Sequence, residues 1–295
     1  MTLLPLVQSR RLGDLRIHAL QAGLQQLDGG AMFGVVPKSL WERRIGADER
    51  NRIPLGMRCL LIEHPQGLVL VDTGAGDKET AKFHGIYGIE NGPVGDAGPT
   101  QLESALAAAG FGAADVTLVV NTHLHFDHAG GNTRRGPDGA PVPSFPGARH
   151  VICRGEWEWA HHTNERTAAS YFGHNYDPLA ESGQLDLVDD GAELLPGLRF
   201  RHTAGHTPHH QSVLLESAGE RLLYLADVCP TAAHVPLPWI MGYDVEPLVT
   251  LETKRRLWAE AADERWTLMF EHDATQAFGR VVADGGRGYA FEKGN

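Results

Sequence analysis

Cysteine is scarce in this 295-residue chain, which has only Cys59, Cys153 and Cys229. Three cysteines without a Cys-x-x-Cys pair exclude an even disulfide framework and predict free thiols in a reducing compartment. No stretch approaches the ~18–20 consecutive apolar residues of a membrane-spanning helix. The apolar residues near the start are interrupted by Pro5 and Gln8, which argues against a signal peptide. We therefore expect a cytoplasmic protein with no membrane partner.

Positive charge is also in short supply. The chain has 26 lysines and arginines against 37 aspartates and glutamates, a formal net charge of -11. Such a surface repels phosphate backbones, so no nucleic-acid partner is expected. Neither repeats nor a linker are visible, which predicts one domain over residues 1–295. Histidine, in contrast, is abundant, and 16 copies direct attention to metals or acid–base chemistry.

Alternating and continuous apolar runs predict a protein of mixed strands and helices. Strands are expected near 15–19 and over 58–63, 67–71, 116–120, 185–188, 198–203, 212–215, 221–225 and 267–270. Helices are expected over 102–110, within 154–182, over 247–262 and near 275–283. Residues 28–40 are too rich in glycine for a regular element and indicate a shaped loop. Strands open each half and helices close it, which indicates two packed sheets with helices outside.

The strongest motif is His123-Leu124-His125-Phe126-Asp127-His128, directly after the predicted strand 116–120. In an extended segment, side chains two residues apart point the same way, so His123 and His125 can reach one ion. Asp127 and His128 can then face a second ion nearby. Imidazole and carboxylate suit zinc and similar divalent metals. Four potential ligands in six residues therefore predict a metal site.

Three further polar residues, His206, Asp227 and His272, each follow an apolar strand-like run. Sites are often built where a strand opens into a loop. Alone, each residue would be read as a cap or turn residue. Together with the first motif they complete a set of seven candidate ligands.

This order of residues, His-x-His-x-Asp-His followed by a single His, Asp and His, resembles the metallo-β-lactamase superfamily. Asp72-Thr73-Gly74 also resembles an early segment of that family. The resemblance implies the α/β class and a four-layer αββα sandwich with two divalent ions, preferably Zn²⁺, at one edge between the sheets. It implies that the first ion is held by His123, His125 and His206, and the second by Asp127, His128 and His272. It further implies that Asp227 bridges both ions and that Asp72 orients one of the ligands.

Two segments carry a narrower resemblance. Residues 123–132 resemble the active-site segment of bacterial N-acyl-homoserine-lactone lactonases, and residues 28–38 resemble the quorum-quenching subgroup called YtnP-like. These similarities imply a hydrolase that opens lactone rings. Because Met32 and Phe33 are apolar residues in a glycine-rich loop, we expect them to border the substrate entrance.

One position departs from the family pattern. Well-studied lactonases of the family carry a tyrosine three residues after the bridging aspartate, and this chain has Pro230 there. Proline has neither a hydroxyl nor an N–H with which to donate to a substrate carbonyl. Tyr243 and His234 are the candidate replacements, with Tyr243 preferred. Asp127 is expected to pass a proton to the departing oxygen.

Other functions stay open at this stage. An organophosphate triesterase or an arylesterase uses the same metals, because superfamily members share metals and differ in substrate. A non-catalytic metal-binding protein is a weaker alternative, since a complete ligand set with an open position suits catalysis. The expected partner is a small lactone or ester, and both a monomer and a homodimer remain compatible with the sequence.

Overall fold

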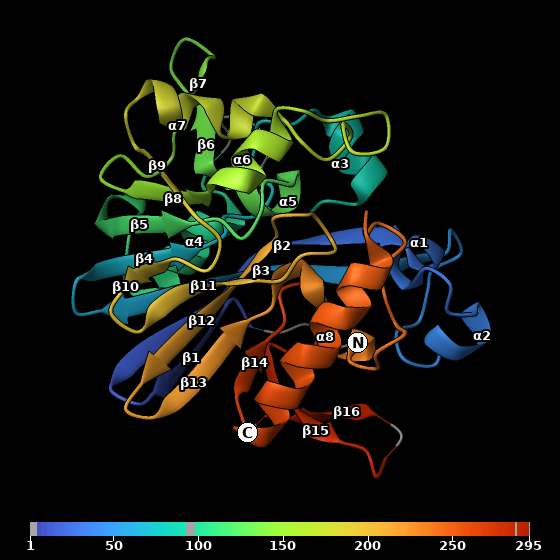
Figure 1. The fold of residues 1–295 in the computed structure, drawn as a ribbon. Coiled ribbons are helices and arrows are strands. Elements are labelled where there is room, and N and C mark those ends of the chain that lie inside the picture. Colours follow the sequence, from blue (N-terminus) through green and yellow to red (C-terminus); the bar gives the residue numbers. More distant parts are fainter. Residues whose placement is uncertain (1–4, 93–97, 287, 295) are drawn as a thin grey trace.

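The structure is a computed structural model that describes residues 5–92, 98–286 and 288–294. Its two main sheets face each other, as the ribbon in Figure 1 shows. The first sheet has the order β1-β2-β3-β4-β5-β8-β9, and the second runs from β10 to β16 in sequence order. Two shorter strands, β6 and β7, form a separate hairpin.

The strands of the first sheet are β1 (Val7–Leu12), β2 (Leu15–Asp28), β3 (Arg52–His64), β4 (Gly67–Val71), β5 (Val116–Val120), β8 (Arg149–Cys153) and β9 (Leu185–Val188). Those of the second sheet are β10 (Glu193–Leu195), β11 (Leu198–His202), β12 (Gln211–Ser217), β13 (Glu220–Tyr224), β14 (Thr267–Met269), β15 (Phe278–Ala283) and β16 (Tyr289–Lys293). The small hairpin is formed by β6 (Thr133–Arg135) and β7 (Pro141–Pro143). The helices are α1 (Gly29–Phe33), α2 (Lys38–Trp41), α3 (Ala81–Tyr87), α4 (Gln101–Ala109), α5 (Phe126–Ala129), α6 (Arg154–Ala160), α7 (Asp177–Glu181) and α8 (Pro247–Asp263).

Strand alternation explains how both faces of each sheet are buried. In β4, Val69 and Val71 belong to the core between the sheets, whereas Leu68 and Leu70 pack toward α4. In β13, Leu222 enters the same central core. Successive side chains point to opposite faces of a strand, so a continuous apolar run fits a strand covered on both sides.

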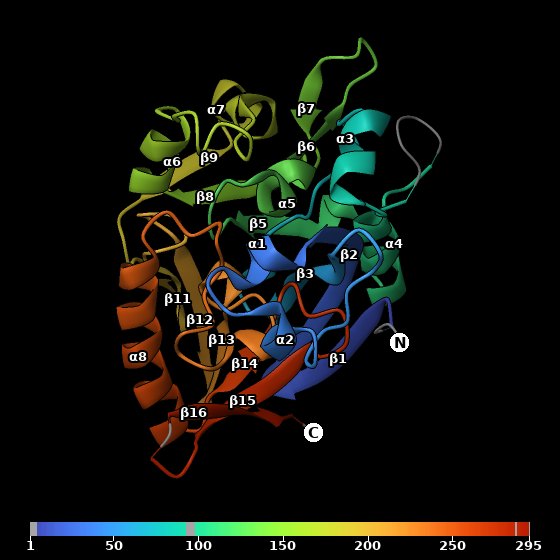
Figure 2. The same ribbon diagram turned by 90° about the vertical axis from the view of Figure 1, so that its right-hand side faces the viewer.

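Helices complete the outer layers. Leu102 and Leu106 of α4 cover the first sheet, and Leu257 and Trp258 of α8 cover the second. Figure 2 shows the two helices on opposite sides of the paired sheets. The predicted four-layer αββα sandwich is therefore confirmed.

Local signals account for helix ends. Helix α4 begins at a capping box in which Thr100 and Glu103 each bond the backbone of the other. It ends at Gly110, whose φ of 95° is a left-handed conformation that glycine adopts without strain. The predicted helix over 102–110 is thus confirmed.

Some predicted elements are wrong. The last helix, expected near 275–283, is the strand β15, which pairs with β16. The expected shaped loop over 28–40 contains the short helices α1 and α2. Asp28 begins α1 by accepting a hydrogen bond from the backbone N–H of Ala31. The prediction of a loop rested on the number of glycines and did not consider this cap.

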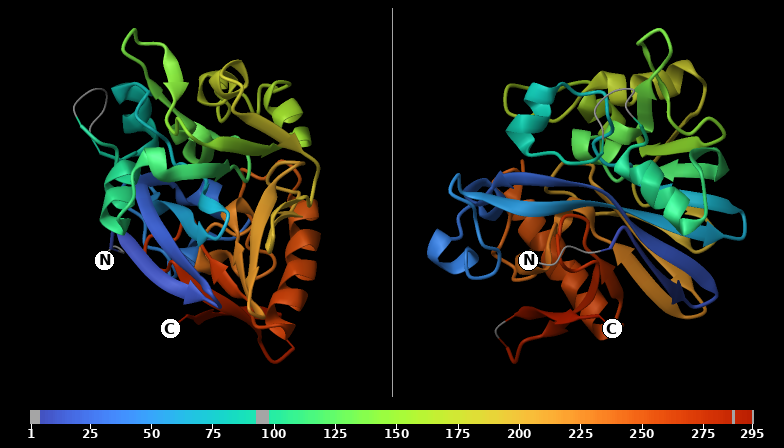
Figure 3. Two further views of the ribbon diagram at one scale, coloured as in Figure 1. Left: turned by 90° about the vertical axis from the view of Figure 1, so that its left-hand side faces the viewer. Right: turned by 180° about the vertical axis from the view of Figure 1, so that it is seen from behind.

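The hairpins β6–β7 and β15–β16 project from opposite ends of the molecule (Figure 3).

Within the described residues, no helix is long and apolar enough to cross a membrane.

Candidate metal centre

Strand direction brings the seven candidate ligands to one edge of the sandwich. Strands β4, β5 and β8 are parallel, so β5 ends at that edge with the His123 motif after it. Strands β13 and β14 are also parallel, so Asp227 and His272 follow strands that end together. The loop from β11 to β12 carries His206 to the same edge, because β12 runs antiparallel to β13.

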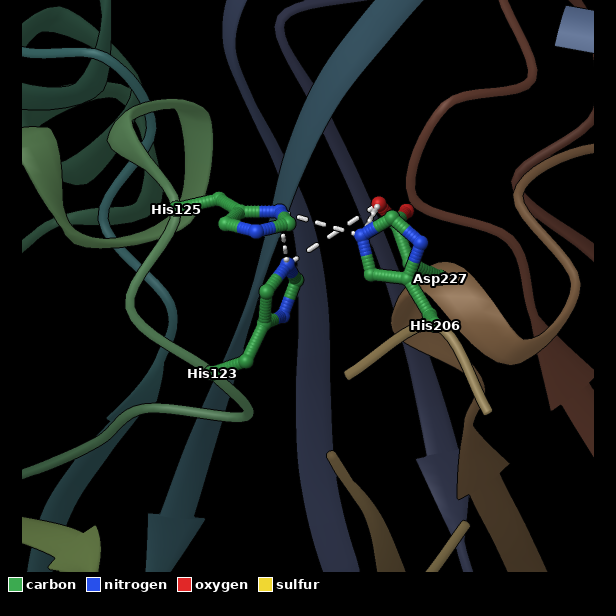
Figure 4. Close-up of side chains that lie close together, drawn as sticks. All are labelled: His123, His125, His206 and Asp227. Atoms are coloured by element: carbon green, nitrogen blue, oxygen red, sulfur yellow. Dashed lines mark hydrogen bonds and ion pairs between the residues drawn. The ribbon is translucent and has the colours of Figure 1, made fainter. Parts of the chain in front are cut away.

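One group consists of His123, His125, His206 and Asp227, shown in Figure 4. The Nδ1 atom of His125 lies 3.1 Å from Nε2 of His123 and 3.0 Å from Nε2 of His206. Oδ2 of Asp227 lies 3.0 Å from Nε2 of His206. Four donor atoms thus converge on one point from three separate parts of the chain.

The second group consists of Asp127, His128 and His272. Nε2 of His272 lies 3.2 Å from Nε2 of His128 and 3.8 Å from Oδ2 of Asp127. The other oxygen of Asp227, Oδ1, lies 3.0 Å from Nε2 of His272. Asp227 therefore presents one oxygen to each group.

Hydrogen bonds at the back of the rings orient the imidazoles. Nδ1 of His206 lies 2.9 Å from Oδ1 of Asp244, and Nδ1 of His272 lies 2.7 Å from the Gly56 carbonyl oxygen. Nδ1 of His128 lies 3.0 Å from Oδ2 of Asp72. An imidazole whose outer nitrogen donates its proton turns an unshared electron pair inward. Inner nitrogens at 3.0–3.2 Å from one another then repel, unless a cation lies between them. The donor set therefore fits divalent metal ions.

The protonation of the buried rings agrees with this arrangement. Burial and the neighbouring histidines lower the pKa values of His123 and His125 well below the ordinary range. Against the opposing effect of burial, Asp227 and Asp244 raise the pKa of His206 to about 10. Without an ion, the buried carboxylates thus favour a positive charge on His206, and a bound divalent ion would supply that charge instead and release the proton.

Two buried glutamates at the site escaped the sequence analysis. Oε2 of Glu271 lies 3.1 Å from Nδ1 of His128 and accepts a hydrogen bond from the Tyr224 hydroxyl. Glu156 accepts hydrogen bonds from the Leu124 backbone N–H and the Thr207 hydroxyl, and so links the His123 motif to the His206 loop. Glu271 directly precedes a candidate ligand, a signal that could have been used, whereas Glu156 lies in helix α6 without any motif.

A cavity of about 220 Å³ opens beside the two groups. His125, Asp127, His206, Asp227 and His272 line it together with side chains from several loops. Its other walls include Gln25, Leu27, Met32, Leu55, Tyr87, Phe126, Met241 and Tyr243. The cavity thus combines the metal-binding groups with an apolar wall, as small-molecule sites do.

Only some of the residues predicted to contact the substrate, or to donate a hydrogen bond to its carbonyl, line the cavity. Met32 and Tyr243 line the cavity. Phe33 does not: its fully buried ring is stacked between His234 and Trp41, which corrects the prediction that it borders the entrance. The other proposed donor, His234, is also buried, with Nδ1 2.7 Å from the Thr231 hydroxyl and Nε2 2.8 Å from the Met32 carbonyl. Because both ring nitrogens are engaged inside the protein, His234 has no free N–H to offer a substrate.

Comparison with known proteins agrees with this architecture. The profile of the Metallo-beta-lactamase superfamily matches residues 54–268, so the chain belongs to that superfamily. It is accordingly a metal-dependent hydrolase that binds divalent ions.

Among curated relatives, the chain is 30% identical over 240 residues to an N-acyl homoserine lactonase of Bacillus sp, covering 78% of this chain and 86% of that protein. It is 26% identical to the N-acyl homoserine lactonase AttM of Agrobacterium fabrum, covering 88% and 94%. Among solved structures, a probable metal-dependent hydrolase from Staphylococcus aureus has a TM-score of 0.86 and 31% identity, covering 97% of this chain and 99% of that one. The dizinc quorum-quenching lactonase AidC has a TM-score of 0.80 at 20% identity, covering 98% and 97%, which supports the fold.

Proposed function

We propose that this protein, folded as one domain, hydrolyses lactone rings and that N-acyl-homoserine lactones are its substrates. The observation that carries the proposal is Asp227, which presents one oxygen to each of the two ligand groups beside a partly apolar cavity. Lactonase relatives at 26–30% identity support the choice of substrate.

Two Zn²⁺ ions are the proposed cofactors, with His123, His125 and His206 for one, Asp127, His128 and His272 for the other, and Asp227 shared. Such a pair activates water near neutral pH and polarises an ester carbonyl. The residues of the chain position the reacting groups. Opening the ring with one water molecule yields a hydroxy acid, so the departing ring oxygen must gain a proton. Asp127 lines the cavity and is the group proposed to accept the proton that the attacking water loses and to pass it to that oxygen.

Tyr243 is proposed to donate a hydrogen bond to the substrate carbonyl oxygen, the role that Pro230 cannot fill. Burial and the carboxylate of Asp28 are the main causes that raise the Tyr243 pKa to about 12. Its hydroxyl therefore stays protonated at neutral pH and remains a donor. A preorganised donor at a developing oxyanion contributes about 2.7–4 kcal/mol to transition-state stabilisation.

Arylesterase or organophosphate triesterase activity is the alternative, since the metal-binding residues do not discriminate between these substrates. A rate comparison across homoserine lactones of several acyl lengths, simple lactones, aryl esters and a phosphotriester tests the proposal. The highest kcat/KM is expected for the homoserine lactones. Faster turnover of the aryl ester or phosphotriester would assign the alternative, and inactivity of metal-loaded protein toward all of them would favour a non-catalytic role.

A further inference from the structure

A second cluster of metal-binding side chains lies outside the cavity. Cys153, Asp190 and His209 place one donor atom each, a sulfur, an oxygen and a nitrogen, within 4.8 Å of one another. None of the three lines the cavity with the ligand groups described above. They come from the end of β8, the β9–β10 turn and the β11–β12 loop. Both sheets therefore contribute to the cluster.

We propose that Cys153, Asp190 and His209 form a third metal site, which takes a zinc-class divalent ion with water in the remaining position. The site is structural and does not depend on which substrate the enzyme hydrolyses. Thiolate, imidazole and carboxylate are the usual protein ligands of zinc. The ion would join the end of β8 to the β11–β12 loop.

The spacing of the donor atoms lies within about half an ångström of that around one tetrahedral ion. Sγ of Cys153 lies 3.0 Å from Oδ1 of Asp190, and Nδ1 of His209 lies 3.8 Å from Oδ2 of Asp190. Ligands of a tetrahedral zinc ion stand about 3.3–3.6 Å apart, given the usual metal–ligand bond lengths. The two distances involve different oxygens of Asp190, and all three donors lie within 4.8 Å of one another, so side-chain rotations would have to bring them onto one ion.

The nitrogen of His209 is the independent sign of a missing ligand. Nδ1 is buried and has no hydrogen-bond partner within the described residues. Gly155 makes room for the ring, because a Cβ atom there would lie 2.2 Å from this nitrogen. A buried polar atom without a partner is costly and calls for an explanation. An ion held with Cys153 and Asp190 supplies one.

Without a metal, Cys153 and Asp190 form a hydrogen-bonded pair. Burial, followed by the Asp190 hydrogen bond, raises the pKa of the Cys153 thiol to about 12, so without a metal the thiol keeps its proton and donates to Asp190. Gln211 donates a second hydrogen bond to the same oxygen of Asp190 at 2.7 Å and holds it in place. Binding the ion would form a metal–sulfur bond and release the thiol proton to solvent.

Co²⁺ provides a probe that distinguishes this site from the paired metal centre. A thiolate bonded to Co²⁺ gives a charge-transfer band in the near ultraviolet, and none of the seven residues at the paired centre is a cysteine. We expect the full-length protein, stripped of metal and titrated with Co²⁺, to develop this band. Elemental analysis should find one ion fewer in Cys153→Ser than in the parent protein, and the variant should lack the band.

Asp190→Asn provides a second variant at an exposed position, and Asp189→Asn is its matched control. Asp190 is 39% exposed and Asp189 is 92% exposed, so both carboxylates reach the surface. Asp190→Asn should weaken Co²⁺ binding at the third site at least tenfold, whereas Asp189→Asn should leave it unchanged. A parent protein without the band, or equal metal contents in the parent, Cys153→Ser and Asp190→Asn, would overturn the proposal. Hydrolysis is not the readout, so this result stands apart from the test of lactonase activity.

Discussion

Asp244 and His206 are joined by a hydrogen bond of 2.9 Å between buried atoms. Asp244 directly follows Tyr243 and also accepts a hydrogen bond from the Thr250 hydroxyl at the start of α8. One contact therefore orients a candidate ligand and anchors the loop that carries the proposed carbonyl donor. The Asp244 carboxylate therefore connects the candidate metal centre to the part of the cavity wall that contains Tyr243.

Replacing Asp244 should therefore weaken metal binding. Asp244→Asn removes the negative charge that keeps the ring proton of His206 on Nδ1 and leaves Nε2 free to bind an ion. The loss of such an outer partner typically costs 10–100-fold in metal affinity or activity. Competition with a chelator measures the affinity, and Asp14→Asn at the surface is the control. Equal affinities in the two variants would show that Asp244 does not support His206.

The shared position of Asp227 predicts unequal losses of metal. Asp227→Ala should lower occupancy at both groups, whereas His272→Ala should mainly remove the ion of the second group. Elemental analysis in a Cys153→Ser background counts the paired centre alone, where the unsubstituted seven ligands should hold two ions. A well-occupied protein of that background with a single ion would contradict the paired arrangement.

Tyr243→Phe should lower kcat on lactones more than tenfold and leave metal content intact, because it removes one hydroxyl from the cavity wall. Tyr87→Phe is the matched control, since Tyr87 lines the same cavity. Steady-state rates together with elemental analysis check both changes. If Tyr87→Phe loses the rate and Tyr243→Phe keeps it, the donor has been assigned to the wrong tyrosine.

Met32 and Phe33, although adjacent, should respond differently to substitution by alanine. Met32→Ala should raise KM more than it lowers kcat, because Met32 lines the cavity. Phe33→Ala removes a fully buried ring and should reduce the free energy of unfolding by about 3–5 kcal/mol. Kinetics and urea denaturation separate the two effects, and a stable Phe33→Ala protein with a raised KM would reverse the assignment.

His150 should make the fold sensitive to acid. Burial and then the charge of Arg149 lower the His150 pKa to about 4, and neither ring nitrogen has a hydrogen-bond partner in the described chain. Between pH 6.5 and 4 the unfolded chain binds the proton more readily, so stability falls as pH falls, by about 3 kcal/mol at most. Urea denaturation at pH 7 and pH 4.5 should show a smaller loss for His150→Leu than for the parent. Equal losses would mean that this imidazole is not the acid-sensitive group.

Short-range patterns determined much of this protein. The motif from His123 to His128 predicts a metal site because it contains four potential ligands within six residues. Apolar runs located most strands because burial on both faces demands continuous apolar sequence. Local propensity predicts a helix near 275–283, whereas the segment forms strand β15, because its pairing with β16 is a long-range contact that local propensity does not contain.

Only the tertiary structure decided which distant residues share a site. His206, Asp227 and His272 each follow an apolar run, a local signal that by itself does not separate a ligand from a cap or turn residue. Parallel pairing of β13 with β14 brings the last two to one edge. The sequence could not distinguish Met32 in the cavity wall from Phe33 in the core, since both are apolar neighbours whose side chains the helix α1 turns in different directions. Likewise, nothing local indicated that Cys153 and His209 meet. Side-chain direction and long-range contacts are set by packing. The residue types therefore indicate metal chemistry, whereas the tertiary structure determines which residues form the site.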